Sequence, residues 1–223
     1  KEAFLIEEPM AAAIGANLDI SEPRGNLIVD IGGGTTDVAV LSYGGIVVAE
    51  SLRLGGDRFD ENITRYIRKE YNLAIGEQTA EAIKINVANC APSPRQEQTM
   101  MIKGRDLVHG LPRQIEITDR IVAKAIEETV GMIIEGIRQV LERTPPELSA
   151  DIIDRGITLS GGGALLKGLP ELVTKKTQIP AYVADMPLEC VAIGTGKALD
   201  DLDKLRSSGS LIGASRRRER KVW

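Results

Sequence analysis

Between residues 27 and 54 the chain consists of short apolar runs separated by glycines, a pattern typical of hairpin-linked strands. Apolar residues fill most of positions 27–31, 38–41 and 46–54, and a glycine triplet and a glycine pair stand between the runs. This arrangement predicts three antiparallel strands. Upstream, an apolar run at 4–6 is followed by Pro9 and an alanine-rich segment, which predicts a strand that turns directly into a helix.

Helical periodicity is strongest in the second half of the chain. From about residue 118 apolar residues recur at three- and four-residue steps, with Thr118 or Asp119 as the cap and Pro145-Pro146 as the end. Strands are expected at 157–159 and 179–184, with further helices from about 164 and over 190–205. In the middle segment we expect helices at 57–71, capped by Asp57, and at 76–88, and strands at 99–103 and 114–117.

The order of these elements predicts an α/β fold. Three antiparallel strands followed by alternating helices and strands favour a mixed sheet with helices on both faces. This differs from the strict strand–helix–strand alternation of a dinucleotide-binding fold. The middle segment interrupts the series as an inserted α+β unit. With 223 residues, of which 43% are hydrophobic, the chain is long enough to bury a substantial core.

Composition and charge exclude several classes of function. Cys90 and Cys190 form no CxxC spacing and His109 is the only histidine, which argues against a disulfide framework and a histidine-based metal site. The net charge is −4, but the last eight residues hold five basic and one acidic, so residues 1–215 carry −8. An acidic body argues against nucleic-acid binding. No run of about 18 uncharged apolar residues is present to predict a membrane span.

The segment DIGGGTTD, residues 30–37, is the strongest candidate for chemistry. Asp30 ends an apolar strand, three glycines form the turn, and Thr35 and Thr36 enter the next strand. Glycines allow backbone N–H groups to converge on an anion, and threonine hydroxyls add donors. A carboxylate at a strand end can hold Mg²⁺ through waters. The alternative is a glycine-rich hairpin with a solvated aspartate.

Two further motifs could belong to the same site. The string SGGGALL, residues 160–166, follows a strand and opens a helix, where N–H groups suit a phosphate or a ring edge. Glu8, directly before Pro9, could orient a water for attack on a phosphate. Taken separately, the first is often only a structural turn, and the second an ordinary acidic residue at a helix start. Two glycine turns together can clamp the two ends of one nucleotide.

Four strings, in order, resemble the actin-type ATPase superfamily and, within it, the MreB family of bacterial actins. They are LIEEPMAAAIGA (5–16), DIGGGTTDVAV (30–40), LGGDRFDENI (54–63) and GITLSGGGALLKGL (156–169). The resemblance implies an actin-like, RNase H-like ATPase lobe: a mixed five-stranded sheet flanked by helices, with an inserted small α+β subdomain. The family's first phosphate loop, a DLGT-type string, does not occur before residue 30. We therefore expect the second of two lobes, with its connectors.

The resemblance also implies a role for individual residues. Asp30 would handle Mg²⁺ through water, and Glu8 and Thr35 would orient the attacking water. The phosphates and the adenosine of ATP would be bound by a larger set: Gly32, Gly33, Gly34, Thr35, Thr36, Gly56, Asp57, Glu81, Lys84, Gly161, Gly162, Gly163 and Ala164. Without the resemblance, Glu81 and Lys84, three apart on one helix, would be interpreted as a solvated ion pair.

The same resemblance divides the chain into parts. Residues 1–18 would be a connecting strand and helix, and 186–206 a helix that returns to the first lobe. The core subdomain would comprise 19–56 and 118–185, and the small subdomain 57–117. Residues 207–223 would form a flexible basic tail.

The function implied is that of an ATP-binding cytoskeletal protein that forms head-to-tail filaments and hydrolyses ATP as they assemble. Such filaments would lie at the inner face of the cytoplasmic membrane, contacting it mainly through the first lobe, and would guide wall synthesis in rod-shaped cells with RodZ-like and MreC-like partners. Two alternatives stay open. One is a DnaK-like chaperone lobe or a sugar-kinase lobe, and the other, for this chain by itself, is a lobe that binds nucleotide weakly without hydrolysing it.

Overall fold

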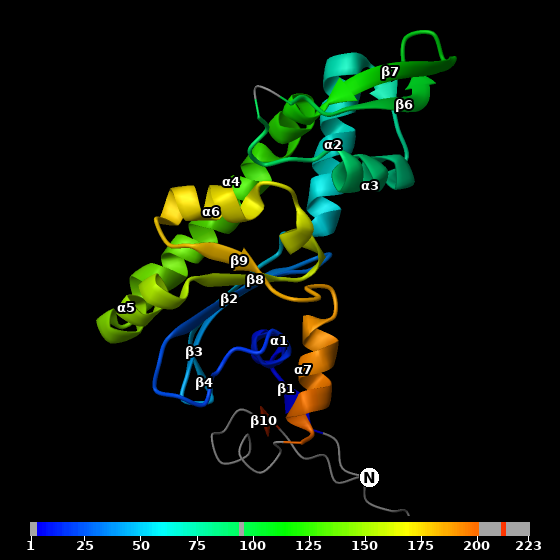
Figure 1. Cartoon of the computed structure of the whole chain (residues 1–223). Helices are drawn as coiled ribbons and strands as arrows, with labels where there is room; N and C mark the ends of the chain where they lie inside the picture. The colour runs from blue at the N-terminus through cyan, green and yellow to red at the C-terminus, as the bar shows by residue number, and fades with distance from the viewer. Residues whose placement is uncertain (1–3, 94–95, 201–210, 213–223) are drawn as a thin grey trace, which may run out of the picture.

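A five-stranded mixed sheet forms the centre of the computed structural model, which describes residues 4–93, 96–200 and 211–212 (Figure 1). Its order is β4-β3-β2-β8-β9. The strands are β2 (Asn26–Ile31), β3 (Thr36–Ser42), β4 (Gly45–Leu52), β8 (Ile157–Ser160) and β9 (Ala181–Val183). Strand β2 pairs antiparallel with β3 and parallel with β8, so the hairpin half of the sheet meets the crossover half at β2. The predicted mixed sheet is confirmed.

Alternate residues of β2 face two separate cores. Leu27, Val29 and Ile31 belong to a large core that also contains buried residues of α4 (Asp119–Arg143), α5 (Pro146–Arg155) and α6 (Leu169–Thr177). Ile28 belongs to a smaller core with α1 (Glu8–Gly15), and α7 (Cys190–Ala198) packs closely on α1. Because successive side chains of a strand point to opposite faces, β2 is buried along its whole length and helices cover both faces.

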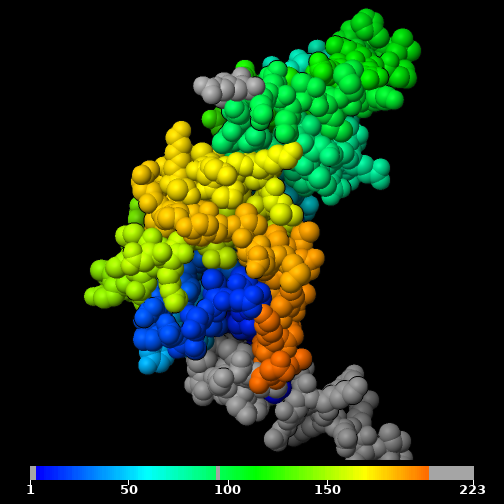
Figure 2. All heavy atoms as spheres, in the orientation of Figure 1, coloured from blue at the N-terminus to red at the C-terminus, as the bar shows by residue number. Residues whose placement is uncertain are grey.

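The inserted segment forms a second, smaller unit near one end of α4 (Figure 1). It contains α2 (Gly56–Tyr71), β5 (Leu73–Ala74), α3 (Glu77–Asn86), β6 (Thr99–Asp106) and β7 (Pro112–Thr118), with a sheet in the order β5-β6-β7. Its apolar residues, among them Phe59 and Ile117, join the large core without interruption. Figure 2 shows this unit, coloured cyan to green, projecting from the body that carries the five-stranded sheet.

Prolines and glycines set several boundaries differently from the sequence prediction. The pair Pro145-Pro146 ends α4 and also starts α5, which the pattern did not predict, because proline is well suited to the first turn of a helix. The helix expected from about 164 is a 3₁₀ turn, η1 (Gly162–Leu165), followed after Gly168 by α6. Gly55, and not Asp57, occupies the N-cap of α2. Thr118 caps α4, accepting a hydrogen bond from the N–H of Ile121.

The two ends of the described chain meet in a two-stranded sheet. Strand β1 (Leu5–Ile6) pairs antiparallel with β10 (Leu211–Ile212). Leu211 and Ile212 lie in the segment predicted to be a flexible tail. Backbone pairing along the edge of β1 gives them a regular structure. The other residues of the predicted tail, and the predicted helical positions from 201 onward, lie outside the described residues. In the described part of the chain, no helix combines the length and apolar character needed to cross a bilayer.

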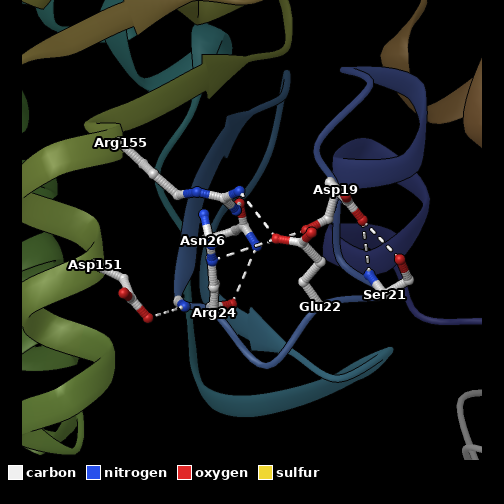
Figure 3. Close-up of polar contacts among 8 residues, drawn as sticks. Asp19, Ser21, Glu22, Arg24, Asn26, Asp151 and Arg155 are labelled. Atoms are coloured by element: carbon white, nitrogen blue, oxygen red, sulfur yellow. Dashed lines mark hydrogen bonds and ion pairs between the residues drawn. The ribbon is translucent and has the colours of Figure 1, made fainter.

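The loop before β2 is tied to α5 by a polar network (Figure 3). Asp151 accepts a hydrogen bond from the N–H of Gly25 at 2.8 Å, and Arg155 donates to Asn26 Oδ1 at 2.7 Å. A side chain at Gly25 would collide with the carbonyl of Leu148, 2.4 Å from its Cβ position. This network fixes the start of β2, and strand pairing with β3 and β8 holds its far end at Asp30 and Ile31.

Candidate functional site

A cleft of about 1380 Å³ lies between the end of the five-stranded sheet and the helices α2 and α3. Its walls come from the glycine turn after β2, the cleft-facing sides of both helices, and η1 with the residues that follow it. Eight of the predicted site residues line this one cavity: Gly32, Gly33, Gly56, Asp57, Glu81, Lys84, Gly162 and Gly163. The two glycine turns, 130 positions apart in the sequence, therefore face the same space.

The first glycine turn is attached to the amino end of α2. The N–H groups of Gly56 and Asp57 donate to the carbonyls of Gly32 and Gly33, both at 2.9 Å. The Cβ position of Gly55 is 2.4 Å from the carbonyl oxygen of Gly33, so only glycine permits this approach. As a result, these two N–H groups of α2 hold the turn and are not available to a phosphate.

Three carboxylates lie close together beside this turn. Asp30 stands opposite Asp37 on β3 and Ser160 on β8, and the Ser160 hydroxyl donates to Asp30 Oδ1 at 2.6 Å. Burial raises the pKa of Asp30, the Ser160 hydrogen bond opposes this, and the charge on Asp37 raises it again. Burial likewise raises the pKa of Glu8 in the first turn of α1, and Asp37 and Asp30 add to the rise.

Among the residues that the structure describes, these carboxylates have no positively charged partner. None of Glu8, Asp30 and Asp37 forms an ion pair with a Lys or Arg among the described residues. Within the same residues, no three acidic, His or Cys side chains converge closely enough to hold a metal by themselves. Excess negative charge without a complete ligand set fits Mg²⁺ held by one carboxylate, waters and phosphate oxygens.

Several predicted residues have structural roles and do not line the cleft. Thr36 is fully buried and its hydroxyl donates to the carbonyl of Leu54 at 2.7 Å, so its side chain anchors the sheet and does not line the cleft; its contact with the nucleotide stays a prediction. Ala164 is buried, and Gly161 has a φ of 78° with its Cβ position 2.3 Å from the Ile31 carbonyl. The expected helix N-terminus after Gly161 is replaced by the four-residue η1. Glu8, Asp30, Gly34 and Thr35 also lie outside the cleft lining.

Lys84 pairs with a residue that the sequence reasoning missed. Its ammonium donates to Asp60 Oδ2 at 2.6 Å and to the carbonyl of Gly56 at 3.2 Å, so the alternative interpretation of Lys84 as the partner of Glu81 in a solvated ion pair does not hold. Burial raises the pKa of Asp60, and the hydrogen bond from Lys84 opposes that rise. A signal for Asp60 was present, since it follows Gly56 by four positions and so lies on the same side of α2.

The MreB/Mbl protein family matches residues 1–207 of this chain. Cell shape-determining protein Mbl of Bacillus subtilis is 55% identical over 205 residues, which are 92% of this chain and 61% of Mbl. Cell shape-determining protein MreB of Escherichia coli is 48% identical over 203 residues, which are 91% of this chain and 58% of that protein. This chain belongs to the MreB/Mbl family.

Two solved structures share this fold. MreB5 of Spiroplasma citri bound to AMPPNP superposes with a TM-score of 0.85 at 40% identity, covering 91% of this chain and 61% of that one. The MamK double helical filament, at 24% identity, shares the fold with a TM-score of 0.72, over 87% of this chain and 58% of that one. The resemblance to the MreB family and the actin-like fold are thereby confirmed. The chain spans about three fifths of the length of these relatives.

Proposed function

We propose that this chain binds ATP in the cleft between the five-stranded sheet and α2 and α3, as part of an actin-like protein that polymerises and helps determine cell shape. The observation that carries the proposal is the convergence of both glycine turns, Glu81 and Lys84 on one cavity. Membership in the MreB/Mbl family supports it, as do the AMPPNP- and ADP-bound structures of Spiroplasma MreB5. No observation on this chain favours the chaperone or sugar-kinase alternative.

Within this proposal, the exposed Gly33 and the neighbouring Gly34 lie where backbone approach to phosphates is unhindered. The Cβ position of Gly34 has no heavy atom within 4 Å, and that of Gly33 is 3.7 Å from the Asp57 carboxylate. Gly162 and Gly163 would contact the adenosine end, and Glu81 would accept hydrogen bonds from sugar hydroxyls. Asp57, exposed in the first turn of α2, faces the same cavity.

Asp30 would hold Mg²⁺ through waters, and the ion would neutralise phosphate charge when bound. The buried Ser160 hydroxyl fixes one Asp30 oxygen and leaves the other free for this role. Glu8 and Thr35 would orient a water for in-line attack, since positioning dominates phosphoryl transfer. The raised pKa of Glu8 suits a carboxylate that accepts a proton from water.

Family membership also supports assembly into filaments as part of the proposal. Head-to-tail contact between identical copies is heterologous, so it propagates into a filament and does not close. The proposal includes filaments at the inner face of the cytoplasmic membrane and RodZ-like and MreC-like partners in wall synthesis. Because the chain covers 58–61% of its relatives, we expect it to bind nucleotide and, without a complete water-excluding site, to hydrolyse it slowly or not at all.

Calorimetric titration with ATP and Mg²⁺, run beside a phosphate-release assay, tests the proposal. We expect saturable binding at one site per chain, weakened by removal of Mg²⁺, with little turnover. Turnover near that of a complete MreB would refute the expectation that hydrolysis is impaired, and the absence of binding would refute the nucleotide site. Electron microscopy of the complete protein with ATP and Mg²⁺ tests assembly, and a failure to form filaments would contradict the cytoskeletal role.

A further inference from the structure

Lys84 has an unusual place on the wall of the cleft. It projects from α3 toward the amino end of α2, the two helices packing side by side (Figure 1). The side chains of Lys84 and Asp60 are each 19% exposed, so the ion pair is largely withdrawn from solvent. An ammonium has three N–H donors, and Asp60 and the Gly56 carbonyl accept two of them. The third is left for a group in the cleft that Lys84 lines.

Two features hold the ammonium at this point. Asp60 Oδ1 is buried without a hydrogen-bond partner among the described residues, so the pair with Lys84 is the carboxylate's one strong compensation for its burial. Gly56 leaves the ammonium room, because its Cβ position is 3.3 Å from Lys84 Nζ and a side chain there would push the ammonium aside by a few tenths of an ångström. Charge-assisted hydrogen bonds in a partly buried setting restrict the geometry more than neutral ones do.

We propose that Asp60 is a positioning residue for nucleotide binding: with the Gly56 carbonyl it fixes the Lys84 ammonium so that its remaining N–H is presented to an oxygen of the bound nucleotide. This inference rests on the proposed nucleotide site and extends it to a residue that lines the cleft but that the resemblance does not assign. A flexible lysine would lose side-chain entropy on contacting a ligand, whereas a fixed one has already lost it.

The charges near Lys84 make positioning and simple charge predict opposite effects of Asp60→Asn on nucleotide affinity. Asp57 and Glu81 lie near Asp60, since the charges on both raise its pKa. Three carboxylates and one ammonium therefore lie in this part of the wall, so its own charges sum to a negative value that opposes phosphate binding. If Asp60 acted only as a charge, replacing it with neutral asparagine would strengthen binding of an anionic nucleotide. If Asp60 acts by positioning Lys84, the same substitution weakens binding although the wall becomes less negative.

The test is calorimetric titration of ADP with Mg²⁺ into the wild-type chain and its variants. We expect Asp60→Asn to raise the Kd about tenfold, on the scale of one hydrogen bond to a charged group. Asp60→Glu, which restores the charge, should recover part of that loss. Lys84→Met should raise the Kd similarly, and adding Asp60→Asn to it should cause no further loss of affinity, because Asp60 acts through Lys84. Glu70→Gln, at an exposed residue of the same helix, is the matched charge control and should leave the Kd unchanged.

Thermal unfolding without nucleotide separates positioning from simple bracing of α2 against α3. A fall in Tm for Asp60→Asn with an unchanged or lower Kd for ADP would overturn the inference and leave the nucleotide site intact. An additive loss in the double variant would also overturn it. If the wild-type chain itself bound no ADP or ATP, the proposed function and this inference would fail together.

Discussion

Replacing Gly55 with alanine should detach the phosphate turn from α2. Gly55 has an extended backbone, with φ −167°, which alanine adopts freely, so the change acts through space alone. The new Cβ would lie 2.4 Å from the Gly33 carbonyl and 2.5 Å from the Gly32 carbonyl. Since ordinary contact begins near 3.4 Å, the turn must move by about 1 Å.

That movement disrupts the hydrogen bonds by which Gly56 and Asp57 hold the turn, both 2.9 Å long. At about 0.5–1.5 kcal/mol each, their loss should lower the free energy of unfolding by roughly 1–3 kcal/mol. For a chain of this size each kcal/mol corresponds to about 2–4 °C, so the Tm should fall by about 2–12 °C. ADP binding should weaken as well, because Gly32 and Gly33 line the cleft.

Differential scanning calorimetry and ADP titration measure the two effects. Gly131→Ala is the matched control: Gly131 is an exposed residue inside α4 whose Cβ position meets no atom within 4 Å. Alanine there should raise stability by about 0.5–1 kcal/mol, because glycine is a poor helix former. If Gly55→Ala left both the Tm and the Kd for ADP within error of the wild type, the attachment of the turn to α2 would be refuted.

Three further experiments test the shifted pKa values of individual groups. Asp30→Asn should raise the Tm at pH 7 without nucleotide, because burial raises the pKa of Asp30 and the folded state disfavours its charged form. A lower Tm would contradict this. Mg²⁺-dependent binding of the nucleotide should be lost in the same variant. Asp106→Asn should destabilise the chain at neutral pH, because hydrogen bonds from the His109 and Val108 N–H groups lower the pKa of Asp106 to about 2. That contribution is present above pH ~4 and lost as the pH falls toward 2, so a pH-independent difference in urea unfolding would argue against it. Burial raises the pKa of Cys90 to about 12. Iodoacetamide at pH 8 should therefore label Cys90 in the native chain at least about a hundredfold more slowly than in the urea-unfolded chain, and equal rates would exclude a suppressed thiol.

Much of the fold follows from local patterns in the sequence. The glycine breaks between residues 27 and 54 predict the hairpins of β2, β3 and β4, and the apolar period after Thr118 predicts α4. These signals depend on neighbours a few positions apart, where side-chain direction is set by the period of a strand or helix. Helix α5 was not predicted because Pro145-Pro146 signals a helix end and a helix start equally well.

The candidate site was predicted only in part. Glycine turns are visible in the sequence because glycine permits close backbone approach, and both turns do reach one cleft. The sequence does not show which glycines face a ligand and which face the protein. Gly32 and Gly33 line the cleft, whereas Gly161 is required by its contact with Ile31 and Thr36 turns inward to Leu54.

By itself, the sequence determined the order of most of the elements, the two glycine turns and, through four strings, the resemblance to the MreB family. The tertiary structure decided which charged groups meet. Lys84 pairs with Asp60, 24 positions away, and not with Glu81 on its own helix. Asp30 accepts a hydrogen bond from Ser160, 130 positions away. The physical reason is that burial makes an unpartnered charge costly, so each group takes the partner that strand register and helix packing bring within hydrogen-bond distance.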